Sequence, residues 1–379
     1  MTCDYNYISS ELRSLIEPAM QKSHSFHDTL SFKEYSNAYI APYYGWEESV
    51  GCVLDCHGNS LGESSFPEWK ENGYYYNVQE ARAENKTVIY LGFLLTVFGH
   101  AFNDNFRAIW FLHTNDFKHY REQGAELVYT TSHNKPLSDA IIKAFDMAGI
   151  DIRAARQIKT LTRFDKVIIP DSSIKSSCYG RLYHAEFCSI INLIKSSFSS
   201  LSSNPLYDKI YFTRTRLKGY KDIGEERIEK LFKRKGYTII APEHLSIEEQ
   251  ITIIMSCSCF ATTEGSISHL SIFCRPGTKV ILVNKANYLN YHQVMINEFA
   301  DLDVTYIEAH HSSRANPSYP WWGPFYLFPT SFCKDYFNTI TPILPYWLHL
   351  DYWIYYLGKS ETGKNIVDTF HKLMNKLRH

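Results

Sequence analysis

Apolar and polar residues alternate along the second half of the chain in blocks that predict strands and helices in turn. Ser246 and Glu249 have the spacing of a capping box at the start of one of these helices. The short apolar runs that predict strands are 209–214, 237–242, 259–264, 279–284 and 304–309. The helical patterns between them are 224–236, 246–258, 266–273 and 291–300. This alternation indicates parallel βαβ units, and hence a doubly wound, Rossmann-like sheet.

The first half of the chain repeats the pattern less regularly. Its strand candidates are 49–55, 87–92, 125–130 and 165–170, and its helical patterns are 99–113, 136–148 and 179–197. A serine-rich stretch at 195–206 is typical of a linker. We therefore expect an α/β fold of two Rossmann-like domains that face a cleft, at 1–200 and 207–330. A helical and aromatic extension at 331–379 follows, and whether it crosses back to the first domain is left open.

Composition narrows the function classes. The formal net charge of −1 gives no basic excess, which argues against a nucleic-acid partner. The first residues lack the basic start and apolar core of a secretion signal, and nine cysteines without such a signal suggest free thiols in the cytoplasm. The 28 Tyr, 23 Phe and 7 Trp residues could build cores, stack on sugars or lie at interfaces.

Two strand ends in the second half carry candidate chemistry. Arg214 closes one predicted strand, with Arg216 just after it, and Glu264-Gly265-Ser266 lies where another strand turns into a helix. Ligands of open parallel sheets bind at the carboxyl ends of the strands. Arginine and a glycine-opened helix start both suit phosphate, and an acid beside them suits sugar hydroxyls. The pattern therefore indicates a nucleotide-diphosphate pocket.

Three segments resemble glycosyltransferase family 61, which includes bacterial capsule enzymes and the O-mannose-linked N-acetylglucosaminyltransferases. These are "YFTRTRLKGYKDIGEERIEKL", "CFATTEGSISHLSIFCRPGTKVILVN" and "GHAFNDNFRAIWFL", which together match two stretches, 88–112 and 209–309. In the third segment His100 and Asp104 carry the family's pattern of His and, four residues on, Asp. The family often has histidine before the glycine where this chain has Glu264, and that departure leaves the role of this side chain open.

The resemblance implies an inverting transfer from a nucleotide sugar to a glycan acceptor, on the two-domain GT-B arrangement, in bacterial surface-polysaccharide synthesis. Asp104 is one candidate for the base and His100 is the other. The implied donor site holds seven residues, which are Arg214, Arg216, Lys218, Glu264, Gly265, Ser266 and Ser268. No cofactor or metal ion is obligatory if these groups neutralise the leaving diphosphate, and "DLD" at 301–303 is expected to be a turn. A lipid-linked acceptor, other capsule enzymes and peripheral contact with the inner face of the membrane are open as partners.

Two other classes of function compete with this one. The first is a catalytically inactive scaffold that binds a glycan or nucleotide beside another glycosyltransferase, and the Glu264 departure keeps it open. The second is a dinucleotide-dependent oxidoreductase, but no G-x-G-x-x-G follows a predicted strand. The aromatic segment 319–328, which includes Trp321 and Trp322, has three interpretations: core packing, an acceptor platform or a membrane-facing surface.

Overall fold

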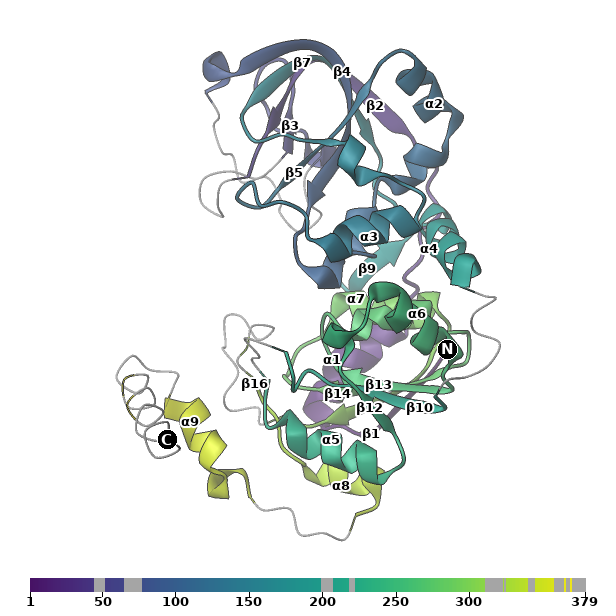
Figure 1. Cartoon of the computed structure of the whole chain (residues 1–379), viewed down its shortest axis with the longest axis vertical. Coiled ribbons are helices and arrows are strands. Elements are labelled where there is room, and N and C mark those ends of the chain that lie inside the picture. Colours follow the sequence, from purple (N-terminus) through teal and green to yellow (C-terminus); the bar gives the residue numbers. More distant parts are fainter. Residues whose placement is uncertain are drawn as a thin grey trace. The chain divides into compact units, whose positions relative to one another are not determined.

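A computed structural model describes residues 1–43, 52–64, 77–198, 207–217, 222–310, 323, 325–339, 345–357, 365 and 369. The chain divides into two compact units (Figure 1). Unit 1 comprises Met1–Gln21, Leu201–Gln293 and Ala300–His379, and unit 2 comprises Lys22–Ser200 and Val294–Phe299. The expected boundary at residue 200 coincides with one division, whereas Met1–Gln21 group with the later residues.

Unit 1 is built on a six-stranded sheet in which every pairing is parallel. The strand order is β1-β15-β14-β13-β10-β12. Its strands are β1 (Thr2–Tyr7), β10 (Lys209–Phe212), β12 (Thr238–Ile240), β13 (Cys259–Thr263), β14 (Lys279–Asn284) and β15 (Asp303–Glu308), and β11 (Asp222–Ile223) pairs separately with β16 (Phe325–Tyr326). The predicted parallel α/β arrangement is confirmed for this unit.

The helices of unit 1 cover both faces of the sheet. Figure 1 shows α5 and α8 on one face and α6 with α7 on the other. The helices are α1 (Ser10–Met20), α5 (Glu225–Arg234), α6 (Ile247–Ser256), α7 (Tyr291–Phe299), whose last six residues belong to unit 2, α8 (Ser331–Phe337) and α9 (Leu350–Leu357), and the 3-10 helices are η7 (Pro242–His244), η8 (Ser268–Phe273) and η10 (Tyr346–Leu348). The capping box predicted for α6 is present, with the Glu249 amide donating to Ser246 Oγ over 3.1 Å and the Ser246 amide to Glu249 Oε2 over 2.7 Å.

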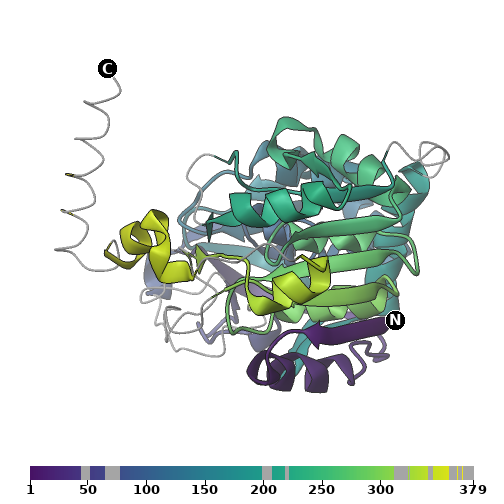
Figure 2. The same ribbon diagram turned by 90° about the horizontal axis from the view of Figure 1, so that it is seen from below.

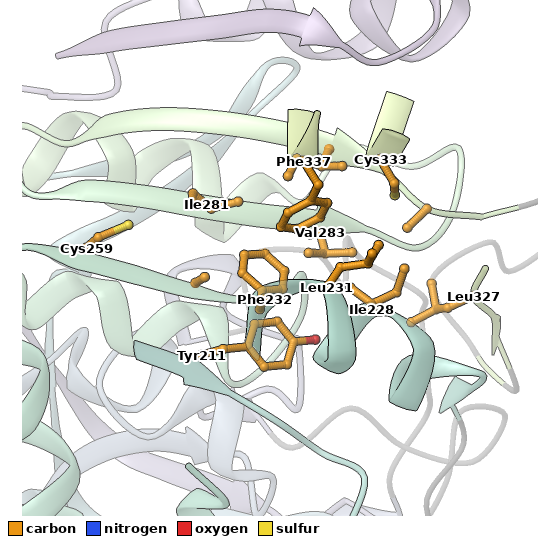
Figure 3. Close-up of a cluster of buried hydrophobic side chains, with 13 residues drawn as sticks. Tyr211, Ile228, Leu231, Phe232, Cys259, Ile281, Val283, Leu327, Cys333 and Phe337 are labelled. Atoms are coloured by element: carbon orange, nitrogen blue, oxygen red, sulfur yellow. The ribbon is translucent and has the colours of Figure 1, made fainter. Parts of the chain in front are cut away.

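One hydrophobic core fills the space between the sheet and its α5–α8 face. Phe232 of α5 stacks on Tyr211 of β10 at a ring-centroid distance of 4.5 Å, and Phe337 of α8 meets Phe232 edge-on at 4.9 Å (Figure 3). Ile281 and Val283 of β14 complete the contact from the sheet. This packing holds β10, β13 and β14 rigidly, so the residues that follow these strands start from fixed positions.

The strand β1 was not predicted. It pairs with β15 in the register Thr2↔Asp303 and forms the edge of the unit 1 sheet (Figure 2). Its side chains are exposed or half-buried, so it lacks the continuous apolar run that identifies the central strands. Residue Asp301, just before β15, lies in a turn with a positive φ of 49°, as expected for "DLD".

Unit 2 holds a mixed sheet in the order β3-β2-β7-β4-β5-β6, where β2 pairs antiparallel with β3 and β7 and the others pair parallel. Its strands are β2 (Phe32–Ala41), β3 (Cys52–Leu54), β4 (Arg82–Leu94), β5 (Glu126–Thr131), β6 (Arg156–Gln157), β7 (Thr162–Pro170) and the hairpin β8 (Ile174–Ser177) with β9 (Gly180–Tyr183). Its helices are α2 (Asn115–Glu122), α3 (Asp139–Met147) and α4 (Ala185–Phe198), with 3-10 helices η1 (Gly62–Ser64), η2 (Val78–Glu80), η3 (Phe98–His100), η4 (Asp104–Phe106), η5 (Ile109–His113) and η6 (Ile152–Ala154).

Three predicted helices differ in the structure. The segment 99–113 forms η3, η4 and η5 rather than one α-helix, because Asn103 has φ −111° and ψ −101°, which no helix accepts. The segment 266–273 is the six-residue 3-10 helix η8. The pattern at 179–197 begins with strand β9 before α4 starts at Ala185. Of the predicted linker, α4 takes the first residues, and 199–206 lie outside the described residues.

The predicted C-terminal extension belongs to unit 1. Helix α8 packs on β1 and β15, and α9 packs beside β11. Trp321 and Trp322 lie outside the described residues, and of the predicted extension only 331–339, 345–357, 365 and 369 are described. In the part of the chain that the structure describes, no helix combines the length and the apolarity that crossing a bilayer requires.

Candidate functional site

The strand order of unit 1 reverses direction between two neighbouring strands. From β10 the chain moves to β12 on one side, and it then returns to β13 on the other side and continues outward through β14 and β15. In open parallel sheets such a switch point is where ligands bind, beyond the carboxyl ends of the strands. Arg214 follows β10 and Glu264 follows β13, so the structure places both predicted residues at the switch point.

Two cations converge on one carboxylate at this edge. Arg214 Nη1 lies 3.3 Å and Lys285 Nζ 3.0 Å from the same atom, Oδ2 of Asp222. The Asp222 side chain is 1% exposed, that of Lys285 10% and that of Arg214 26%. One carboxylate cannot neutralise two cations, so this cluster, which we call the Arg214–Asp222–Lys285 triad, carries a net positive charge.

The loop that carries Arg214 is fixed by acids of α5. The backbone amide of Arg214 donates to Glu225 Oε1 over 3.2 Å, and the same oxygen accepts from the Tyr211 hydroxyl over 2.8 Å. Thr213 and Thr215 both donate to Glu229 Oε2, over 2.8 and 2.9 Å. These bonds hold the backbone of the loop independently of the arginine head group, which is therefore directed at Asp222 without disturbing the fold.

Gly265 lies directly against Lys285. The glycine has φ +135°, a conformation that L side chains rarely adopt, and a Cβ atom there would lie 3.3 Å from Lys285 Nζ. The glycine therefore allows the lysine head group to approach the backbone at the end of β13. A side chain at this position would require the ammonium group to shift by a few tenths of an ångström.

Glu264 is buried beside this glycine. The residue is 6% exposed, and its Oε2 accepts a hydrogen bond from Nδ2 of Asn284 over 2.8 Å. Burial raises the pKa of Glu264 from 4.5 to about 7, while the Asn284 hydrogen bond and the charge of Lys285 act in the opposite direction. Near neutral pH the side chain therefore exists in both protonation states and can either accept or donate a hydrogen bond.

The serines of the predicted site differ in exposure. Ser268 is fully buried, and its hydroxyl accepts from the Gly265 amide over 3.1 Å and donates to the Gly265 carbonyl over 2.8 Å. It thus fixes the turn from within, and the Gly265 amide is already bonded. Ser266 is exposed. Because η8 is a short 3-10 helix, the positive charge of this edge comes from Arg214 and Lys285 rather than from a helix dipole.

The remaining predicted residues of unit 1 lie apart from the triad or outside the description. Arg216 is about half exposed and its Nη2 lies 3.6 Å from Oε1 of Glu229. Lys218 falls outside the described residues. The sequence did not single out Lys285, Asp222 or Asn284. Lys285 and Asn284 stand at the end of a predicted strand, and that position was a usable signal.

In unit 2 the residues His100 and Asp104 meet at the carboxyl end of β4. Their segment is tied to that strand by Asn105, whose Oδ1 accepts from the Leu95 amide over 2.8 Å and whose Nδ2 donates to the Leu95 carbonyl over 3.0 Å. His100 Nδ1 lies 2.5 Å from Asp104 Oδ2. Consecutive 3-10 turns bring the two side chains together, in place of the single α-helix predicted for 99–113.

The two side chains differ in exposure. The His100 side chain is 29% exposed and that of Asp104 is 1% exposed. Behind Asp104 lies Arg181 of β9, itself 1% exposed, with Nη2 3.3 Å from Asp104 Oδ1. Arg181 also donates to the hydroxyl of Ser176. The order from inside to outside is therefore a buried arginine, a buried carboxylate and a partly exposed imidazole.

This order assigns different chemistry to the two predicted residues. A carboxylate bonded to Nδ1–H leaves the lone pair of a neutral imidazole on Nε2, which is the arrangement of a general base. No sequence pattern identifies Arg181, an isolated arginine in the short strand β9.

Comparison with known proteins gives one family. Residues 98–281 match the model of the family described as Glycosyltransferase 61. That span includes His100, Asp104, Arg181, Arg214 and Glu264, and ends just before Asn284 and Lys285. No curated protein matches the chain.

Proposed function

The chain belongs to glycosyltransferase family 61 over residues 98–281, and on that premise we propose that it transfers a sugar, with inversion, from a nucleotide sugar to a glycan acceptor. The observation that carries the donor assignment is the Arg214–Asp222–Lys285 triad at the switch point of the unit 1 sheet. A net positive, largely buried cluster beside a close-approach glycine suits a diphosphate.

The proposed donor site would bind the nucleotide sugar through two kinds of interaction, charge and hydrogen bonding. Arg214 and Lys285 would bind the two phosphates. Contacts with the phosphates would replace part of the interaction that both cations make with Asp222. Glu264, held by Asn284, would bond to a hydroxyl of the ribose or of the sugar. Because the carboxyl end of β13 fixes Glu264 and Gly265 next to each other, phosphate and hydroxyl groups would be recognised within one nucleotide sugar.

The proposed base is His100, oriented by Asp104. An acceptor hydroxyl oxygen attacks the anomeric carbon from the face opposite the diphosphate and forms the new glycosidic bond. The bond between the anomeric carbon and the phosphate oxygen breaks, and its electron pair leaves with the nucleoside diphosphate. The hydroxyl proton passes to Nε2 of His100. The burial of Asp104 favours His100 as the base, because an acceptor hydroxyl can reach the partly exposed imidazole but not the buried carboxylate.

Three further elements belong to the proposal. Arg214 and Lys285 would neutralise the charge that develops on the leaving diphosphate, so we expect transfer to continue in the presence of EDTA. We propose the GT-B arrangement because the transfer requires the bound nucleotide sugar and the catalytic base to act on the same acceptor. A role in bacterial capsule or other surface polysaccharide synthesis rests on the family resemblance.

Calorimetric titration with UDP, GDP, CDP and CMP tests the donor site. We expect one nucleotide to bind selectively, and Arg214→Ala and Lys285→Ala each to weaken that binding by about tenfold or more, as expected for loss of a charge-assisted hydrogen bond. Lys209→Ala and Lys279→Ala are matched controls, because they remove exposed cations from the amino ends of the same two strands, β10 and β14.

The outcomes separate the competing functions. Absence of binding for all four nucleotides, or equal losses in the control variants, would contradict the donor site. Selective binding of a nucleotide sugar without turnover on any acceptor would favour the inactive scaffold. Turnover that disappears in His100→Ala while nucleotide binding persists would support the complete proposal.

A further inference from the structure

The elements η10 and α9 present aromatic and aliphatic side chains to solvent. We call this surface the η10–α9 face. It comprises Trp347, Leu348, Leu350, Trp353 and Tyr356, whose exposed fractions lie between 38% and 63%. Five large apolar side chains exposed within ten residues are uncommon on a protein surface, where such residues usually occur singly.

The face is held in a fixed orientation by the opposite side of α9. Tyr352 and Tyr355 are buried against Tyr326 of β16, at ring-centroid distances of 5.3 and 5.6 Å. Asp351 Oδ2 lies 2.8 Å from Nη1 of Arg227 in α5. Leu350, Trp353 and Tyr356, spaced by three residues, consequently project away from this anchor.

The two tryptophans are also fixed relative to each other. Trp353 Nε1 donates to the backbone carbonyl of Trp347 over 2.8 Å, and the ring of Trp353 lies 6.0 Å edge-on from that of Tyr356. Because the rings are already ordered, insertion into another phase would cost little additional side-chain entropy. Tryptophan and tyrosine are the residues that favour the boundary between lipid headgroups and acyl chains.

The formal charge of the sequence that follows the face fits an anionic surface. Asp351 is the one acid within 345–357, and it is engaged by Arg227. The residues that follow, 358–379, carry a formal charge of +3 in a chain whose total is −1. Their basic residues are Lys359, Lys364, Lys372, Lys376 and Arg378, against Glu361 and Asp368. An apolar aromatic face followed in sequence by basic residues is a combination typical of segments that bind anionic lipid bilayers.

We propose that the η10–α9 face is a peripheral docking site for an anionic membrane surface, with the basic residues of 358–379 supplying the electrostatic part of the binding. The aromatic rings would lie at headgroup depth. This inference is independent of the nucleotide assignment, because none of its residues belongs to the Arg214–Asp222–Lys285 triad or to the His100–Asp104 pair.

Flotation with lipid vesicles tests the proposal. The full chain is expected to float with vesicles of phosphatidylcholine and phosphatidylglycerol, and less at high salt. The double variant Trp347→Ser/Trp353→Ser should bind these vesicles at least about tenfold more weakly, because it removes most of the inserted apolar area. Leu193→Ser is the matched control, since Leu193 is a similarly exposed apolar residue on α4.

A charge variant separates the electrostatic from the apolar contribution. Lys372→Gln/Lys376→Gln/Arg378→Gln should lower binding to the anionic vesicles by on the order of tenfold to a hundredfold, with little change for vesicles of phosphatidylcholine alone. Brominated lipids should quench tryptophan fluorescence in the wild type and less in the double variant. Unchanged thermal melting of the variants shows that they fold.

Two results would overturn the proposal. The first is failure of the wild type to float with anionic vesicles at low salt, or equal flotation of the double variant. The second is a wild type that self-associates in gel filtration, a double variant that is monomeric, and no vesicle binding by either. That pattern would mean that a second copy of the chain covers the face.

Discussion

Among single residues, Glu264 has the least ordinary setting, because an acid is buried at a sheet edge with one amide partner. Its pKa of about 7 lies above the value of 4.5 expected in the unfolded chain. The folded state therefore holds more protons than the unfolded state between these two values, and its stability falls as the pH rises through that window. Above about pH 7 the full cost of the buried charge is present.

We expect Glu264→Gln to remove this pH dependence. Between about pH 5 and about pH 8 the wild type should lose on the order of 3 kcal/mol of unfolding free energy that the variant retains. Urea denaturation at several pH values measures the difference. Parallel stability curves for the two proteins would show that the carboxyl group ionises normally in the folded state.

The His100–Asp104 pair predicts a separation of activity from stability. His100→Ala should reduce kcat by about 10²- to 10⁴-fold with little loss of stability, because the imidazole is partly exposed. Asp104→Ala leaves the buried cation of Arg181 without this carboxylate and should cost about 3–5 kcal/mol of unfolding free energy. Thermal melting alongside kinetics distinguishes the two effects, and similar melting temperatures for both variants would contradict this description.

Some residues of the candidate site could be identified from the sequence and others could not. Arg214, Glu264, His100 and Asp104 were identified because they follow strands or carry a family motif, and such positions are visible in a linear pattern. Lys285 followed a predicted strand as well and was passed over. Asp222 and Arg181 have no local signature, since each acquires its partner only when distant segments fold together.

At the scale of elements, helix α5 has a glycine at each end, and substitution of the two glycines should have different effects on stability. Gly224 before the helix has φ +91° and Gly236 after it has φ +81°. A Cβ atom on Gly224 would lie 2.1 Å from the Leu327 carbonyl oxygen, whereas a Cβ atom on Gly236 meets nothing within 4 Å. A side chain at Gly224 would therefore cause both backbone strain and a steric clash, whereas a side chain at Gly236 would cause backbone strain alone.

Gly224→Ala should therefore destabilise the protein by about 3 kcal/mol or more, and Gly236→Ala by about 1 kcal/mol. Because Gly224 directly precedes α5, whose Glu225 supports the Arg214 loop, the first variant should also weaken nucleotide binding. Chemical denaturation and calorimetry of the two alanine variants give the comparison. Equal destabilisation would mean that the Leu327 segment moves aside at no cost.

The elements themselves were predictable where burial is continuous. β10, β13, β14 and β15 are buried strands that read as apolar runs, and the alternation with helices gave their parallel order. β1 and β2 have many exposed positions and were missed. The segment 99–113 was misassigned because its apolar residues keep helical spacing while the backbone at Asn103 interrupts the helix. Such an interruption depends on tertiary contacts.

At the scale of the whole molecule, the ligand should act on one unit. A nucleotide that binds unit 1 raises the stability of that unit by RT ln(1 + [L]/Kd), which is about 2.7 kcal/mol at a hundredfold excess over Kd. Differential scanning calorimetry should show the transition of unit 1 moving upward in temperature while that of unit 2 moves less. At the same ligand concentration, Arg214→Ala should reduce the stabilisation to about half, because a tenfold weaker site leaves about 1.4 kcal/mol. An equal shift of both transitions would place binding elsewhere.

The position of β1 has a consequence for how the protein is made. The ribosome releases β1 long before β15, and the register Thr2↔Asp303 separates the two strands by about 300 residues. At the usual rate of synthesis this strand waits about 15–60 s for its partner, with its backbone donors and acceptors unpaired. The unit 1 sheet therefore reaches its complete width only after translation of β15.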